Sequence, residues 1–173
     1  MKLANFEKEY LSIVIGQFRH FKERAELGIA QLSEEELHWK PNEESNNIAI
    51  LIQHISGNMH SRWVDLLTSD GEKSYRDRDR EFVDKLESKF HIMEQWESGW
   101  KLLFESIENL EENDLSKTVT LRGQPLSVLQ AIQIEIAHLS YHLGQILYIG
   151  KQIKNTQWKI LSIPKKSVNA SAH

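Results

Sequence analysis

The stretch LSVLQAIQIEIAHLSYHLGQILYIGK, residues 126–151, decides the fold class. Its apolar residues recur every three or four positions, which is the spacing of a buried helical stripe and not the alternation of a β-strand. Apolar residues occupy nearly every side of the predicted helix, which indicates a helix deep inside the protein. Pro125 precedes this stretch and is expected at or near the first helical turn.

The same spacing predicts three further long helices. One runs from about Asn5 to Leu32, a second from the capping cluster at 45–47 to about Thr68, and a third carries the apolar residues between Phe82 and Leu110. The pattern Ser33 to Glu36 is a capping box that opens a short helical turn, and residues 118–121 are expected to form a short extended piece. The sequence therefore predicts an all-α protein, a four-helix bundle.

The predicted bundle covers about residues 5–151 of a single domain that spans residues 1–173. The last 22 residues, 152–173, are expected to be an irregular tail that packs on the bundle and frays from Ser167 onward. Between the second and third helices, the charged stretch from Arg76 to Arg80 is expected to be a solvated linker, with an arginine that reaches an anionic substrate as the alternative.

Composition excludes several classes of function. With 40% apolar residues in 173, the chain can bury a core without disulfides, and it contains no cysteine for a thiolate zinc site or a nucleophile. The formal charge of −4 disfavours nucleic acid and anionic lipid as partners. The longest strictly apolar run, Ile48 to Ile52, is far too short for a membrane span, and charges occur early in the chain. We expect a cytoplasmic protein with no membrane partner.

Three histidines are candidate metal ligands. His138 and His142 are four residues apart, so both lie on one face of the predicted helix, among Ile and Leu. Each buried imidazole needs a polar partner, which can be a shared ion or a hydrogen-bonding neighbour in the core. His54 lies beside the apolar stripe of the second helix and can approach the other two. Three neutral imidazoles would leave coordination positions open for water or substrate, as in a catalytic site.

Two segments carry a resemblance to a known family. NIAILIQHISGN (47–58) and AHLSYHLGQ (137–145) resemble the DinB-like superfamily of metal-binding four-helix bundles. RWVDLLTSDGEK (62–73) and LSIP (161–164) resemble, more narrowly, a bacterial branch that is a domain of unknown function. The resemblance covers most of the chain, from the first helix to the tail.

The resemblance implies a ligand set and a kind of chemistry. His54, His138 and His142 take the places of the three metal-binding histidines, and the usual ions are zinc, nickel or a similar divalent metal. Some members of the superfamily are S-transferases or isomerases that depend on a low-molecular-weight thiol, so such a thiol is a possible cosubstrate. The narrower branch carries no activity that the resemblance can transfer.

Four polar residues are candidates for the surroundings of the ion. Asn58 and Gln145 share helical faces with His54 and His142, and Arg62 lies on the same helix as His54, so these three are candidate substrate-binding residues. For Asn58 and Gln145, packing behind the metal ligands is the alternative. Glu135 is a candidate general base or ligand-orienting group, with a solvated or ion-paired surface carboxylate as the alternative. The remaining histidines are expected to be structural or exposed: His20, His38, His60, His91 and His173.

Two hypotheses about function follow. In the first, a mononuclear metalloenzyme activates a thiol or water for transfer to, or hydrolysis of, a small-molecule substrate. In the second, a noncatalytic metal-binding bundle acts through dimerisation or partner binding. Five Trp and six Phe suggest more apolar surface than one bundle must hide, so a homodimer is expected.

Overall fold

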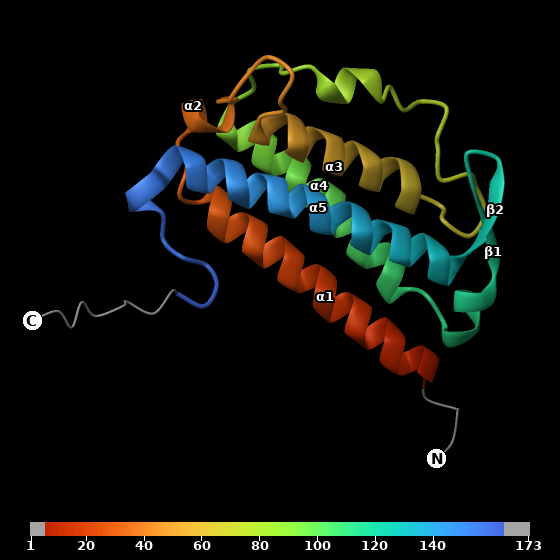
Figure 1. Ribbon diagram of the computed structural model, residues 1–173. Coiled ribbons are helices and arrows are strands. Elements are labelled where there is room, and N and C mark those ends of the chain that lie inside the picture. The colour runs from red at the N-terminus through yellow and green to blue at the C-terminus, as the bar shows by residue number, and fades with distance from the viewer. Residues whose placement is uncertain (1–5, 165–173) are drawn as a thin grey trace, which may run out of the picture.

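The computed structural model describes residues 6–164 and is mostly helical (Figure 1). Four long helices and a short one are joined by three 3-10 turns and one small antiparallel sheet. The elements in chain order are α1 (Phe6–Ile29), α2 (Glu34–Leu37), α3 (Ile48–Trp63), η1 (Asp79–Phe82), α4 (Lys89–Glu108), η2 (Glu112–Ser116), β1 (Thr118–Leu121), β2 (Gln124–Ser127), α5 (Val128–Lys154) and η3 (Asn155–Gln157).

The long helices pack side by side around one apolar core (Figure 1). α3 packs against α4 and α5, while α1 packs against α5 and α4. The largest side chains of the core are fully buried and include Trp63, Trp96 and Trp100. Aromatic side chains of this size contribute most to the hydrophobic stabilisation of a core.

Several local predictions are confirmed. The Ser33 and Glu36 capping box opens α2, and the Asn47 side chain accepts a hydrogen bond from the Ile50 N–H at the start of α3. Residues 118–121 are extended and form β1. The prediction for Pro125 is wrong: it lies in β2 opposite Thr120, and Ser127 caps α5. A proline fits this place because an edge strand need not donate every N–H group.

Four predicted helix limits are also wrong, and one of them is the end of α1, which lies at Ile29 and not at Leu32. α3 ends at Trp63 and not at Thr68, because Val64 is extended and Asp65 has a φ of +49°. α4 begins after its cap Ser88, so Phe82 belongs to the linker instead. α5 continues three residues past the predicted limit of 151. The errors at the end of α3 and the start of α4 arise where the apolar spacing continues although the backbone has left the helix, whereas α5 stays helical beyond the predicted limit.

α5 is not buried on all sides. It packs on α1 and α3, and its third side is open, so Ile134, Tyr141 and Tyr148 are exposed. The prediction of a helix deep inside the protein is therefore wrong. The buried side of α5 nevertheless carries charge and imidazole groups, at Glu135 and His138, and this unusual content locates the candidate site.

The segment after α5 is only partly packed. Trp158 is half-buried and close to Gly150, where a Cβ would lie 3.0 Å from the indole. Ile163 is 93% exposed, so the expectation that the whole tail packs is wrong there. The predicted fraying from Ser167 lies outside the described residues. Within residues 6–164, no helix has the length and apolar character needed to cross a membrane.

Candidate metal centre

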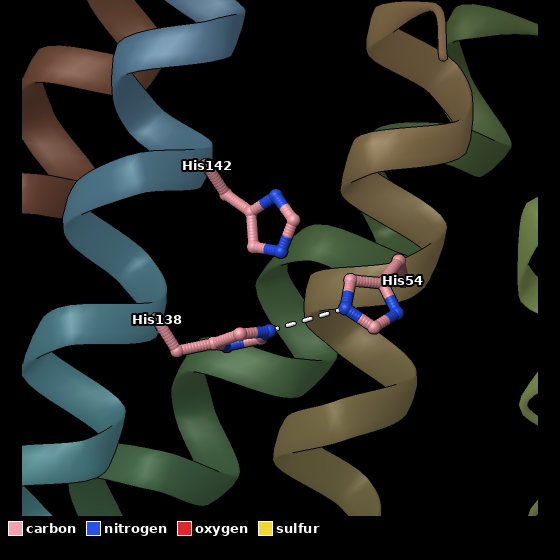
Figure 2. A group of neighbouring side chains, drawn as sticks. All are labelled: His54, His138 and His142. Atoms are coloured by element: carbon pink, nitrogen blue, oxygen red, sulfur yellow. Dashed lines mark hydrogen bonds between the residues drawn. The ribbon is translucent and has the colours of Figure 1, made fainter. Parts of the chain in front are cut away.

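The structure brings His54, His138 and His142 together between α3 and α5 (Figure 2). All three are buried, and one ring nitrogen of each lies within 4.8 Å of the others. The His54 and His138 Nε2 atoms are 3.1 Å apart. The rings converge because His138 and His142 stack on one side of α5, and α3 presents His54 to that side. This group could hold a metal ion.

Each ring has a hydrogen-bond acceptor behind it, on its Nδ1 side. His54 Nδ1 donates to Glu81 Oε2 at 2.9 Å, and His142 Nδ1 donates to Gln145 Oε1 at 2.8 Å. His138 Nδ1 faces Glu135 Oε1 at 3.6 Å. Such acceptors favour the tautomer with its proton on Nδ1, and the Nε2 lone pair then points away from the acceptor.

Two buried atoms that lack a hydrogen-bond partner indicate whether these residues suit a metal ion. His138 Nδ1 and Glu135 Oε1 are both buried without a hydrogen bond. If His138 donated from Nε2 to His54, its Nδ1 lone pair would face the carboxylate and both atoms would stay unpartnered. With a proton on Nδ1, His138 can donate to Glu135 Oε1 once the two atoms move slightly closer, and both atoms are then satisfied. The Nε2 lone pairs of His54 and His138 would then face each other at 3.1 Å. A shared cation relieves that repulsion, so the donor set fits a divalent ion.

Burial keeps the His54 and His142 imidazoles neutral. Removal from water lowers the pKa of His54, and its hydrogen bond to Glu81 opposes that shift only in part. Burial and the neighbouring His138 lower the pKa of His142 to about 4. A neutral imidazole retains the lone pair that a metal needs, so His54 and His142 are ready to act as ligands at neutral pH.

Glu81 is a site residue that the sequence analysis missed. It lies in η1, where Gln53 Nε2 donates to its carbonyl oxygen at 2.8 Å. Arg76 donates to both carboxylate oxygens, at 2.7 and 2.8 Å. Burial would raise the pKa of Glu81, but the hydrogen bonds from Arg76 and His54 lower it overall, so the carboxylate is ionised. An ionised Glu81 is a strong acceptor for His54 Nδ1.

The linker that carries Glu81 differs from the prediction. The Arg76 side chain is only 4% exposed, so the stretch from Arg76 to Arg80 is not uniformly solvated. Phe82 lies against the His54 ring at 4.6 Å between ring centres. The sequence offered one signal for Glu81, namely a carboxylate that follows a charged run and precedes an aromatic residue. No helical or strand periodicity accompanies this signal.

Two of the four predicted surrounding residues lie behind the histidines. Glu135 is fully buried, at 0% exposure, and Arg62 Nη1 donates to it at 2.9 Å, so the surface alternative is wrong. Burial would raise the pKa of Glu135, but His138 and Arg62 lower it overall. Its place beside His138 favours an orienting role over that of a general base. Gln145 likewise holds His142 from behind and does not line the pocket described next.

A pocket of about 410 Å³ opens beside His54 and His138. Its volume is in the range of small-molecule sites. Asn58 and Arg62, the other two predicted residues, line it. The remaining charged and phenolic groups of its wall come from the linker, the hairpin and α5: Arg76, Arg78, Arg122 and Tyr141. The sequence analysis gave contact between an arginine of the 76–80 stretch and an anionic substrate only as the alternative to a solvated linker, and it did not bring Arg122 or Tyr141 to the histidines.

The other described histidines lie away from this centre. His60 Nε2 contacts Ser98 Oγ on α4 at 3.0 Å, and His91 contacts Ser88. His38 contacts Asp84 and the Glu87 carbonyl. His173 lies outside the described residues.

The fold and the site together define a mostly helical protein with a buried three-histidine group able to hold a metal ion. A family of uncharacterised proteins, described as protein of unknown function DUF1572, matches residues 5–167, and the chain belongs to this family. A comparison with curated proteins gives no match.

Proposed function

We propose that this protein is a mononuclear metalloenzyme of the DinB-like four-helix-bundle type, in which His54, His138 and His142 hold one zinc or nickel ion. The observation that carries the proposal is the orientation of the rings. All three Nδ1 atoms face oxygen acceptors, and the closest approach between rings is through Nε2. The sequence resemblance and the position of the histidines between two long helices support the DinB-like assignment.

The chain's residues supply positioning and access. Glu81 and Gln145 accept hydrogen bonds from the Nδ1 atoms of His54 and His142, which orients these two rings and raises the basicity of the opposite nitrogens. Glu135 faces His138 Nδ1 at 3.6 Å and would orient the third ring. When bound, a divalent ion supplies Lewis acidity, which lowers the pKa of a thiol or water and so provides a nucleophile at neutral pH. Asn58 and Tyr141 contribute polar groups to the pocket where the second reactant would bind. The chain has no cysteine, so a reacting thiol would come from a low-molecular-weight cosubstrate.

The pocket favours catalysis over a purely structural ion. Structural sites close their coordination shell with protein ligands, whereas catalytic sites retain an open position. Within residues 6–164, the group of potential metal ligands here has three histidines and no fourth member. The pocket beside two of them gives a small molecule access to that position.

A screen of reactions tests the proposal. Wild-type protein and His54→Ala, each loaded with zinc or nickel, are incubated with electrophilic carbon and acyl substrates, with a panel of cellular thiols and without thiol. Turnover that needs both His54 and a thiol supports transfer, and turnover that needs His54 without thiol supports hydrolysis. Absence of metal from wild-type protein, with no binding of zinc or nickel on titration, overturns the proposal.

We also propose that the protein forms a homodimer. Large apolar side chains outside the pocket wall are exposed, among them Ile13, Phe90 and Tyr148, and a second copy would cover some of them. Light scattering at micromolar concentration should give twice the chain mass of 20.2 kDa. A single species of one chain mass contradicts this proposal and leaves the metal proposal intact.

A further inference from the structure

The wall of the pocket beside the histidines carries an excess of positive charge. Four arginines line it: Arg62, Arg76, Arg78 and Arg122. Arg62 is paired with Glu135, Arg76 with Glu81, and Arg122 with Glu72. Arg78 makes no ion pair with any residue in the range 6–164 that the structure describes. The excess is local, because the whole chain has a formal charge of −4.

Arg78 is held near the histidines without a counter-ion. Its Cζ lies 5.0 Å from the centre of the Phe82 ring, and that ring lies 4.6 Å from the His54 ring. The Arg78 guanidinium is therefore within about 10 Å of the His54 ring. The Arg78 guanidinium donates no hydrogen bond to the described residues, so its N–H groups are available for a ligand.

Arg122 reaches the same pocket from the hairpin between β1 and β2. Asp70 fixes this turn, because its carboxylate accepts from the N–H groups of Arg122 at 2.9 Å and Gly123 at 2.8 Å. Only Nε of the Arg122 side chain is engaged, by Glu72 at 3.1 Å. Its terminal Nη groups make no hydrogen bond with the described residues. A second fork of donors therefore faces the pocket.

Two buried polar atoms in the pocket wall point independently to a polar ligand. Asn58 is 4% exposed, and its Oδ1 has no hydrogen-bond partner among the described residues. Arg62 Nε is buried and also unpartnered there. His54, Asn58 and Arg62 occupy successive turns of α3, so these groups form a row that leads away from the histidines. Buried polar atoms usually have a hydrogen-bond partner, so we expect a ligand or ordered water to supply partners for this row.

We infer that the ligand of this pocket is a small molecule with a carboxylate or phosphate group, which Arg78 and Arg122 bind. Its polar middle contacts Asn58, and its opposite end lies at His54 and His138. Arginine forks suit both anions because their oxygens accept paired N–H bonds. Only the placement of the opposite end at a metal rests on the proposed function. The anion-binding part depends on side chains that the chain itself supplies.

Anion binding is measured by NMR titration of nitrogen-labelled protein at pH 8 and low ionic strength. The probes are inorganic phosphate, succinate and, as an uncharged control, succinamide, each added to metal-free and zinc-loaded protein. Succinate or phosphate should shift the Arg78 and Arg122 side-chain signals in both forms, and succinamide should not. The stronger of the two anions identifies the group that the pocket prefers.

Arg78→Ala should weaken binding by about tenfold or more, as expected for the loss of charged hydrogen bonds. Arg80→Ala is the matched control, because Arg80 is nearby, 83% exposed, paired with Asp77 and absent from the pocket wall. Its affinity should equal that of wild type. Arg78→Lys should retain part of the affinity, since it keeps the charge and loses the fork.

The outcomes separate this inference from the proposed function. Binding to metal-free protein that depends on Arg78 supports the inference, whatever the metal content. Binding only to the zinc-loaded form, with equal affinity in Arg78→Ala, means that the anion binds the ion directly and overturns the inference. Equal affinities of Arg78→Ala and Arg80→Ala, or no binding of either anion, also overturn it.

Discussion

His38, which is half-buried, and the buried three-histidine cluster show two ways in which this protein accommodates imidazoles. His38 Nδ1 contacts Asp84 Oδ1 at 2.9 Å, and its Nε2 contacts the Glu87 carbonyl at 2.9 Å. Both partners are protein oxygens, so neither ring nitrogen of His38 faces a second imidazole with which it could share an ion. In the cluster, His54 and His142 have an oxygen acceptor on Nδ1, and His54 Nε2 approaches another imidazole. A structural histidine therefore differs from a candidate metal ligand in what its Nε2 atom contacts, a protein oxygen in the first case and another imidazole in the second.

The largest expected effect comes from removing a ligand. His138→Ala should lower the metal content from about one ion per chain to none after gel filtration, because two imidazoles hold an ion far less tightly than three. The metal affinity should fall by more than a hundredfold, because loss of a ligand should cost more than loss of a residue that only orients a ligand, which costs up to about a hundredfold. Elemental analysis measures the content.

Two controls belong with that variant. His60→Ala should keep its metal, because His60 contacts Ser98 and not the cluster. His38→Ala should also keep its metal but unfold at a lower temperature, because it loses contacts that join α2 to the linker. Equal metal loss from all three variants would remove the distinction between the two kinds of histidine.

Removing the acceptor behind a ligand should have the next largest effect. Glu81→Ala should weaken zinc binding by about 10 to 100-fold, because His54 loses the bond that orients its ring. Glu81→Gln should lose less, since its amide oxygen can still accept from His54. Competition with a coloured chelator gives both affinities, and circular dichroism checks folding. A folded Glu81→Ala protein with wild-type affinity would show that Glu81 does not support the ligand.

The His38 region should show its own dependence on pH. Burial would raise the pKa of Asp84, but hydrogen bonds from the Leu86 N–H, His38 and Asn47 lower it overall. A carboxyl with a lowered folded pKa adds stability above its unfolded pKa, about 3.9, and this stability is lost as the pH falls through the folded pKa.

Asp84→Asn removes that titration. At pH 6 the variant should be less stable than wild type by about 1 to 2 kcal/mol, in proportion to the charged hydrogen bonds lost. The difference should shrink as the pH falls from 6 to 3. Urea unfolding of the metal-free proteins measures it. A difference that is constant with pH would mean that the Asp84 charge does not stabilise this region.

The smallest effect concerns the space beside Glu81. A Cβ at Gly57 would overlap Glu81 Oε1, so Gly57→Ala should displace the carboxylate and weaken zinc binding several-fold, less than its complete removal. Gly144→Ala is the matched control on α5, because its Cβ would meet nothing within 4 Å. The control should keep its affinity and gain up to about 1 kcal/mol of helix stability. Equal affinities of the two variants would show that Glu81 tolerates displacement.

Periodicity located the helices better than their limits. Asn47 and the Ser33 box act through contacts within three or four residues, so a sequence pattern can show them. The turn at Asp65 and the pairing of Pro125 with Thr120 depend on the backbone and on a partner strand. The apolar spacing continues across both places, and for this reason the predicted helices were misplaced there.

The candidate site divides in the same way. His54, His138 and His142 lie on periodic helices, so spacing could place them on facing sides. Glu81 reaches His54 from a 3-10 turn. Arg78 and Arg122 reach the pocket from a linker and a hairpin. In none of these segments does a period relate sequence to side-chain direction. Arg62 was expected to face a substrate, but its ion pair with the buried Glu135 could not be predicted without knowing how closely α3 approaches α5.

A crystal of the zinc-loaded protein, measured at the zinc absorption edge, tests the central claim most directly. The account predicts one anomalous peak per chain, bonded at about 2.0 to 2.1 Å to Nε2 of His54, His138 and His142, with an open position toward the pocket. Glu81 and Gln145 should still accept from the Nδ1 atoms. A peak bonded to Nδ1 atoms, a fourth protein ligand that closes the ion, or no peak between α3 and α5 would contradict the account.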